Sequence, residues 1–254
     1  MKFGGAAVAS PEKFALIADI IVERKKLYPQ VIVVVSAMAN MTNELGDLAK
    51  KVHPNPPRRE YDMLVSVGER ISISLLAMAL SLKGQEAISF TGSQSGIITT
   101  DEHSEARILE VKPFRLLPHL EAGKVVIVAG FQGVSRKGEI TTLGRGGSDT
   151  SAVALGVSLK CETVEFFKDV AGIFSEDPKQ NPQAQFFPYL SHQEALKITL
   201  KGAKILHSRS IELAERNKLR LHVLPFATWA NRETPGTVIG DYQFMETPLF
   251  EEPW

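Results

Sequence analysis

Short apolar runs rich in Val, Ile and Phe alternate along this 254-residue chain with amphipathic segments long enough to form helices. The run Val31–Val35 is short and β-branched, which indicates a strand buried on both faces. Strands of this kind, separated by helix-length segments, are typical of a largely parallel sheet covered by helices. The alternation therefore predicts the fold class α/β.

Capping residues and apolar spacing set the expected elements. Ser10 and Pro11 read as an N-cap followed by proline at the first helical position. The first expected helix starts at residue 11, and further helices are expected over 40–51, 61–82, 113–122, 148–159, 192–200 and 208–217. Strands are expected over 31–35, 86–90, 124–129, 163–167 and 219–225. The acidic and aromatic tail beyond Asp241 is expected to be a flexible end or a surface strap, with a partner-binding segment as the alternative.

Charge and cysteine content exclude several classes of function. The chain has 29 Lys and Arg against 29 Asp and Glu, so nothing indicates a polybasic surface for nucleic acid or anionic lipid. The single Cys161 excludes an intramolecular disulfide and a cysteine zinc cage, and we expect it as a buried thiol. We find no HExxH motif, no apolar run of membrane-spanning length and no signal peptide, so we expect a cytoplasmic protein without a protein-bound metal.

Two glycine-rich segments are candidates for holding phosphate or carboxylate. In Lys2–Gly5, paired glycines free backbone N–H groups and the lysine adds a point charge, although a simple turn explains the segment about as well. In Gly144–Asp149, glycines surround Arg145 just before an expected helix, whose N-terminus favours an anion. Asp149 is either part of a ligand site or a capping acid of that helix.

A third candidate segment, Lys168–Pro178, follows an expected strand, where open α/β sheets keep their ligands; a solvated connecting loop is the alternative. Familiar nucleotide motifs are missing from the sequence. We find no GxxxxGK[ST], no GxGxxG after a strand, and neither HRD nor DFG. A phosphotransferase with this sequence therefore uses another architecture.

Several short motifs follow one another along the chain: Lys2–Gly5, Ser36-Ala37-Met38 with Thr42-Asn43, Gly68-Glu69-Arg70, Thr141–Thr150 (TTLGRGGSDT), Asp169-Val170 with Gly172-Ile173, Asp177-Pro178 and Gly202-Ala203-Lys204. Together these motifs resemble those of aspartokinases, within the amino acid kinase family. They occur in the family's order over residues 2–240, and residues 57–156 look especially like actinobacterial-type aspartokinases. Seven ordered motifs make this resemblance specific.

The resemblance implies a three-layer αβα sandwich around a central, mainly parallel sheet. It implies a single domain over residues 1–240, with an amino-acid-binding lobe at about 1–150, a nucleotide-binding lobe at about 151–240 and a tail at 241–254. The implied reaction joins L-aspartate and ATP to give 4-phospho-L-aspartate and ADP, with Mg²⁺ on the nucleotide. A homodimer without ACT regulatory domains, and so without feedback control, is also expected.

The resemblance also implies roles for individual residues. Arg145 would clamp the aspartate α-carboxylate, Glu69 would receive its ammonium group, and Ser36, Thr42 and Ser148 would add hydroxyl contacts. Lys2, assisted by Gly4 and Gly5, would neutralise the transferring phosphoryl group, and Asp149 would organise the lysine. The residues expected around the nucleotide are Lys168, Asp169, Phe174, Asp177 and Lys204.

Several departures from the family pattern set further expectations. Lys2 is only the second residue, whereas the family has a full strand before its lysine, so we expect a poorly positioned lysine at a frayed terminus. Ala6-Ala7 replaces a Thr/Ser pair, and Lys168 stands where many members have Thr or Ser. These changes keep two alternatives open: an enzyme of this fold with another carboxylate or amino-acid acceptor, and a non-catalytic ligand-binding subunit.

Overall fold

The computed structural model describes residues 1–176, 178, 181–202, 205–226, 235–241, 243 and 245–252. Its helices are α1 (Pro11–Leu27), α2 (Met41–Val52), α3 (Arg58–Val65), α4 (Val67–Leu82), the 3₁₀ turn η1 (Pro113–Arg115), α5 (Leu117–Glu121), α6 (Gly147–Ser158), α7 (His192–Leu200) and α8 (Ser208–Arg216). Its strands are β1 (Lys2–Phe3), β2 (Ile32–Val35), β3 (Ala87–Phe90), β4 (Ile97–Thr99), β5 (Ile108–Val111), β6 (Val125–Ala129), β7 (Gln132–Ser135), β8 (Ile140–Thr142), β9 (Thr163–Lys168), β10 (Ile173–Phe174), β11 (Phe186–Phe187), β12 (Tyr189–Leu190), β13 (Arg220–Pro225) and β14 (Thr237–Ile239).

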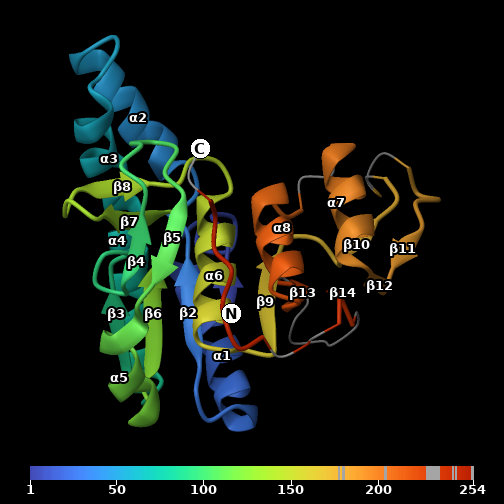
Figure 1. Cartoon of the computed structure of the whole chain (residues 1–254). Coiled ribbons are helices and arrows are strands. Elements are labelled where there is room, and N and C mark those ends of the chain that lie inside the picture. The colour runs from blue at the N-terminus through green and yellow to red at the C-terminus, as the bar shows by residue number, and fades with distance from the viewer. Residues whose placement is uncertain are drawn as a thin grey trace.

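An eight-stranded sheet in the order β12-β14-β13-β9-β1-β2-β6-β3 runs through the molecule (Figure 1). The pairings from β13 to β3 are all parallel, and only β14 pairs antiparallel with its neighbour β13. The two-residue β1 lies between β2 and β9, so Lys2 is opposite both Val34 and Phe166. The predicted mainly parallel sheet is confirmed.

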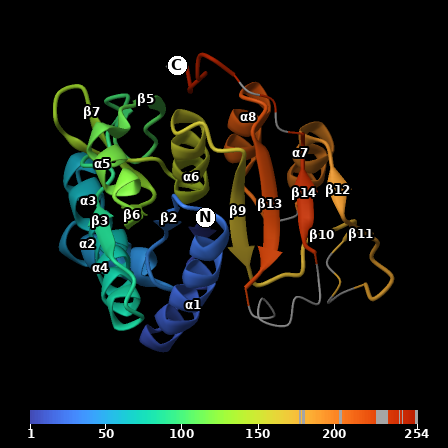
Figure 2. The same ribbon diagram turned by 90° about the horizontal axis from the view of Figure 1, so that it is seen from below.

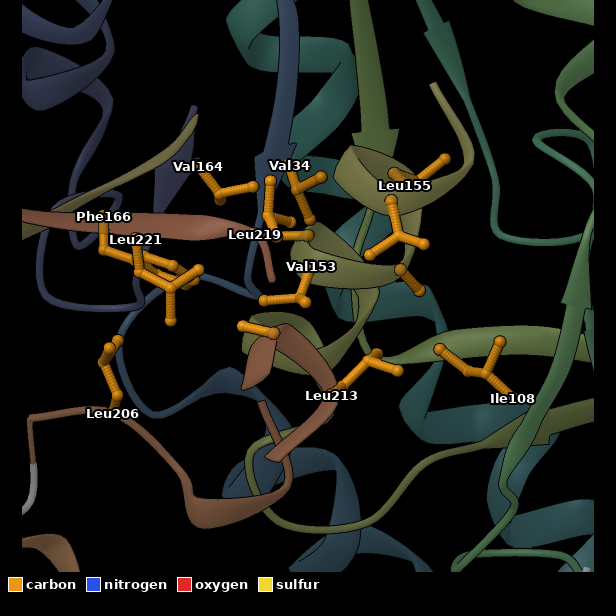
Figure 3. Close-up of a cluster of buried hydrophobic side chains, with 14 of the residues drawn as sticks. Val34, Ile108, Val153, Leu155, Val164, Phe166, Leu206, Leu213, Leu219 and Leu221 are labelled. Atoms are coloured by element: carbon orange, nitrogen blue, oxygen red, sulfur yellow. The ribbon is translucent and has the colours of Figure 1, made fainter. Parts of the chain in front are cut away.

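Helices cover both faces of this sheet (Figure 2). Because side chains alternate along a strand, Val33 and Val35 of β2 join a core cluster with α1 and α4, whereas Val34 joins a cluster with α6 and α8. Figure 3 shows Val34 and its neighbours gathered around Val153 of α6. The expected three-layer αβα sandwich is therefore confirmed.

A second, four-stranded sheet in the order β5-β4-β7-β8 lies beside the main sheet and was not expected from the sequence. Its strands are three or four residues long, too short to give a clear alternation. The hairpin β7–β8 turns at Gly138, whose φ of +85° suits glycine. This small sheet matters for function because β8 leads directly into the segment Gly144–Asp149.

The expected helix over 61–82 is present as two helices that meet at Ser66, which is fully buried. By length and composition the stretch Arg58–Leu82 passes as a candidate membrane span, so the expectation of no such stretch was wrong. Leu76 and Leu80 explain the apolar composition, because both are fully buried in the core that α4 forms with α1 and the sheet. α4 belongs to an outer layer of the sandwich, whereas α3 packs on α2 and β8.

The C-terminal segment lies along the surface as a strap. Asn217 at the end of α8 binds the backbone of Leu249 through both its amide oxygen and its amide nitrogen. The backbone N–H of Glu251 donates to the carbonyl of Ile108 in β5. Of the alternatives for the tail, the surface strap describes residues 249–252.

Candidate active site

Four neighbouring parallel strands, β9, β1, β2 and β6, end at the same edge of the sheet. Residues that the sequence singles out lie at these strand ends: Lys168 is the last residue of β9, Gly4 follows β1 and Ser36 follows β2. Gly130, just after β6, lies against Ser148 of α6. A Cβ on Gly130 would lie 2.8 Å from the Ser148 Cβ, so glycine lets α6 begin against this loop. Carboxyl ends of parallel strands are where open α/β sheets bind ligands. This edge is the candidate active site.

Lys2 is firmly positioned, contrary to the expected frayed terminus. The N-terminal amine donates to the Ile32 carbonyl at 2.8 Å, and the Met1 carbonyl accepts from Val34 N–H at 2.8 Å. With strands on both sides, only 4% of Lys2 is exposed. The second residue of the chain is therefore part of the central sheet.

Asp149 joins two lysines that are far apart in the sequence. Its Oδ1 lies 2.5 Å from Lys2 Nζ and its Oδ2 lies 3.2 Å from Lys168 Nζ. Gly146 is the N-cap residue of α6, and no side chain caps that helix, so the capping interpretation of Asp149 was wrong. The carboxylate faces the sheet edge and organises two ammonium groups there.

Burial and charge act against each other in this cluster. Burial alone would raise the pKa of Asp149, but the charges of Lys2 and Lys168 outweigh it and lower that pKa to about 2. Burial also lowers the pKa of Lys2, and Asp149 opposes that shift. Lys2, Lys168 and Asp149 together carry a formal charge of +1. A Cβ on Gly4 would lie 3.4 Å from Lys2 Nζ, so the backbone of the Gly4–Gly5 loop approaches the ammonium closely.

Glu69 is a second buried carboxylate, in the first turn of α4, and its pKa is shifted in the opposite direction to that of Asp149. Its Oε1 accepts from Ala37 N–H at 2.9 Å, whereas its Oε2 is buried and has no hydrogen-bond partner among the described residues. Burial raises its pKa to about 7, although Ala37 and, more weakly, Lys2 oppose the shift. An unpartnered buried acceptor is costly unless a ligand satisfies it. A cationic ligand group fits this position.

The segment before α6 makes a tight turn on glycines. Gly144 and Gly146 have φ values of +70° and +73°, and a Cβ on Gly146 would lie within 2.3 Å of the His207 ring. Arg145 between them is exposed and lines a cavity of about 640 Å³ with Ser104, Arg107 and Arg209. Within the described part of the chain, Arg145 makes no hydrogen bond or ion pair, and no contact joins it to Glu69. That Arg145 and Glu69 bind the same amino acid therefore stays a prediction.

The remaining predicted residues follow or belong to several of these elements. Ser36 follows β2, Thr42 is in the first turn of α2 and Ser148 in that of α6, and all three are half-buried. Asp169 is exposed after β9, and Phe174 of β10 packs against Phe186 at a ring-centroid distance of 5.2 Å. Asp177 and Lys204 lie outside the described residues.

Sequence reasoning missed the residues that support the glycine-rich segment from behind. Asp62 is fully buried and accepts hydrogen bonds from Thr142, whose backbone and hydroxyl lie 3.0 and 2.7 Å away. Arg209 lies on the other side and donates to the carbonyl of Leu143. Asp62 lies on the charged helix α3 (RREYDMLV), so no local signal in the sequence distinguished it from the neighbouring exposed charges.

Comparisons with known proteins agree with this geometry. A family model described as "Amino acid kinase family" matches residues 1–225. The chain is 46% identical over 248 residues to the aspartokinase of Bacillus sp. (strain MGA3), covering 98% of this chain and 59% of that protein. It is 47% identical over 239 residues to the aspartokinase of Mycolicibacterium smegmatis, covering 94% of this chain and 56% of that protein. The chain thus spans less than two thirds of the length of these relatives.

Solved structures of aspartate kinases superpose on this chain. The aspartate kinase from Synechocystis superposes with a TM-score of 0.84 at 42% identity, covering 97% of this chain and 40% of that one. E. coli aspartokinase III in complex with aspartate and ADP superposes with a TM-score of 0.82 at 26% identity, covering 95% of this chain and 64% of that one. The arrangement of layers described above is shared with both structures.

Proposed function

The chain belongs to the amino acid kinase family, and on that premise we propose that it transfers the γ-phosphoryl group of ATP to the side-chain carboxylate of L-aspartate. The products are 4-phospho-L-aspartate and ADP. The aspartokinase relatives support this acceptor, and the E. coli structure holds aspartate and ADP on a related fold. The matched relatives are longer than this chain, so the proposal concerns the activity that this part carries.

The observation that carries the proposal is the buried cluster of Lys2, Asp149 and Lys168. A carboxylate nucleophile needs no general base, so catalysis consists mainly of aligning two anions and offsetting their repulsion. The three side chains together carry a formal charge of +1, and this charge would supply that stabilisation at the buried sheet edge beside the Gly4–Gly5 backbone. Asp149 would hold both ammonium groups in place through its two carboxylate oxygens.

Glu69 and Arg145 are proposed to recognise the amino acid. The unpartnered Oε2 of Glu69 would accept the aspartate ammonium group, which would also favour the ionised form of Glu69. Arg145, on the exposed turn, would bind the α-carboxylate in bidentate fashion. The hydroxyls of Ser36, Thr42 and Ser148 would complete the contacts.

The nucleotide is proposed to bind on the side of β9. Lys168 at the end of that strand, together with Asp169 and Phe174, would contact it, and the same role is proposed for Asp177 and Lys204. MgATP enters this proposal as the substrate, with Mg²⁺ bridging the phosphates. Residues at about 1–150 would then hold the amino acid and residues at about 151–240 the nucleotide, across one continuous sheet.

The test is an ADP-release assay with MgATP and L-aspartate. We expect aspartate-dependent turnover in the wild type and a loss of kcat on the order of a hundredfold in Asp149→Asn, because the neutral amide no longer positions the two lysines. The matched control Asp47→Asn changes an exposed aspartate on α2 and should keep full activity. No aspartate-dependent turnover in the wild type, or full activity in Asp149→Asn, contradicts the proposal.

The same assay addresses the acceptor. Ala7 is buried in the apolar core with Phe14, and Ala6 is exposed, so the Ala6-Ala7 pair adds no hydroxyl to the site. A faster rate with a different carboxylate would replace aspartate as the acceptor. We further propose that the protein is cytoplasmic and forms a homodimer through the outer faces of α3 and α4.

A further inference from the structure

Asp62 and Arg209 support the glycine-rich segment from behind, and neither is proposed to contact a substrate. Asp62 on α3 binds two separate segments. Its Oδ2 accepts from Ser104 N–H at 2.9 Å and from Thr142 N–H at 3.0 Å, and its Oδ1 accepts from the Thr142 hydroxyl at 2.7 Å. His103 Nδ1 lies 3.0 Å from Oδ2. Asp62 thereby fixes residues 103–104 against residue 142.

Arg209 on α8 binds residues slightly further along the same two segments. Its Nη1 donates to the carbonyl of Leu143 at 2.5 Å and its Nη2 to the carbonyl of Ala106 at 3.1 Å. The segments are also joined directly, because Ala106 N–H donates to the Thr142 carbonyl at 2.9 Å. Arg209 therefore holds the residue that immediately precedes Gly144 and Arg145.

Glu251 in the C-terminal strap orients Arg209. Its two carboxylate oxygens lie 2.8 Å from Nε and 2.9 Å from Nη2 of Arg209, a bidentate pair. The Oε2 of Glu251 also accepts from Ile108 N–H at 2.7 Å, and its own N–H donates to the Ile108 carbonyl. Because the guanidinium is planar, a carboxylate that binds its Nε and Nη2 also fixes the direction of its remaining N–H groups. In Arg209 these groups point toward the carbonyls of Leu143 and Ala106.

We propose that Arg209, set in place by Glu251, is a positioning residue for the turn that presents Arg145 to the acceptor. The wall of the cavity beside Arg145 includes both Arg209 and Glu251. Without the carboxylate, the guanidinium turns into this cavity, Leu143 loses its donor and the exposed Arg145 turn loosens. The role in acceptor binding rests on the proposed function, whereas the role in ordering the turn does not.

The experiment compares Glu251→Gln with the matched control Glu252→Gln, whose described contact is made through its backbone carbonyl to Arg107. We expect Glu251→Gln to raise the KM for aspartate about tenfold, the worth of one charge-assisted hydrogen bond, with kcat and the KM for ATP unchanged. Arg209→Lys keeps the charge but cannot bridge Glu251 and both carbonyls, so it should show the same split. Glu252→Gln should match the wild type.

Hydrogen exchange on the ligand-free proteins gives a readout that does not require activity. Faster exchange in Glu251→Gln confined to the amides of residues 143–148 supports the proposal. Unchanged exchange there, or faster exchange throughout the chain, overturns it, and so does an unchanged KM for aspartate in an active enzyme. If the wild type does not turn over aspartate, the proposed function is wrong. The exchange result then still decides whether Arg209 orders the turn.

Discussion

At the scale of single residues, the site contains two buried carboxylates with opposite behaviour. Asp149 has two lysines within 3.2 Å, and its pKa falls to about 2. Among the described residues, Glu69 accepts from the Ala37 N–H and forms no ion pair, and burial raises its pKa to about 7. Ionised carboxylates are tolerated in a protein interior only when partners offset the lost hydration. Asp149 therefore has its partners in the folded chain, whereas Glu69 still lacks one.

We expect the Glu69 carboxyl to make stability depend on pH. Its pKa of about 7 in the folded protein lies above the ordinary 4.5, so between these values the folded state binds more protons than the unfolded state. Stability must then fall as pH rises from 4.5 to 7, by about 3 kcal/mol in total. Glu69→Gln keeps the acceptor for Ala37 N–H and removes the titration, so the variant should gain stability relative to wild type at pH 8 but not at pH 4.5.

Urea unfolding at pH 4.5 and pH 8 measures this difference. Glu44→Gln, an exposed glutamate on α2, serves as the control and should leave the pH dependence of the wild type intact. An equal stability difference between Glu69→Gln and wild type at both pH values contradicts the raised pKa.

At the scale of elements, the short turn before α6 has the tightest requirements. α6 starts at Gly147, packs on the sheet through Val153 and Leu155, and carries Asp149 in its first turn. Gly146 is left-handed and lies directly against the His207 ring. A small displacement of this turn would move Asp149 relative to Lys2 and Lys168. The element thus transmits packing at α8 to the charges of the site.

Gly146→Ala tests that dependence, with Gly138→Ala as its matched control. Both glycines have positive φ, +73° and +85°, so both changes carry a backbone penalty of about 1–2 kcal/mol. Only at Gly146 does a Cβ meet another group, the His207 ring at 2.2 Å, whereas nothing lies within 4 Å at Gly138. We expect urea unfolding to show Gly146→Ala to be less stable than Gly138→Ala by about 1–3 kcal/mol. Equal losses would mean that the ring moves aside freely.

At the scale of the whole molecule, one sheet joins the parts of the chain that hold the two proposed substrates. β1 pairs with β2 on one side and with β9 on the other, so Lys2 and Lys168 belong to the same rigid layer. On the outside of this layer, α3 and α4 expose a row of apolar side chains at helical spacing: Met63, Val67, Ile71, Met78 and Leu82. Such a row is typical of a surface that another subunit covers.

We expect this row to form the homodimer interface. Ile71→Glu combined with Met78→Glu places charges in its centre and should convert a dimer into a monomer, as measured by light scattering after size-exclusion chromatography. Leu200→Glu, on the exposed surface of α7, is the control and should leave the mass unchanged. A wild type that is monomeric at micromolar concentration, or a double variant that stays dimeric, contradicts this interface.

The sequence by itself determined the fold class and most elements of the main sheet. Buried parallel strands such as Val31–Val35 and the helix over 148–159 follow from local composition, because apolar runs and glycine-rich starts act over a few residues. The second sheet was missed because its strands are too short to show a period. The break at Ser66 was missed because no proline or polar run separates Leu64-Val65 from Val67 in the sequence.

The tertiary structure alone decided how the charged residues pair. Nothing local distinguishes a capping Asp149 from one that binds lysines, and the choice follows from β1 lying between β2 and β9, which brings Lys2 and Lys168 to one carboxylate. The same holds for Lys2, whose position near the chain start predicts fraying until its two neighbouring strands are known. Strand order is a property of long-range packing, so it sets ion pairs and pKa values that no short stretch of sequence contains.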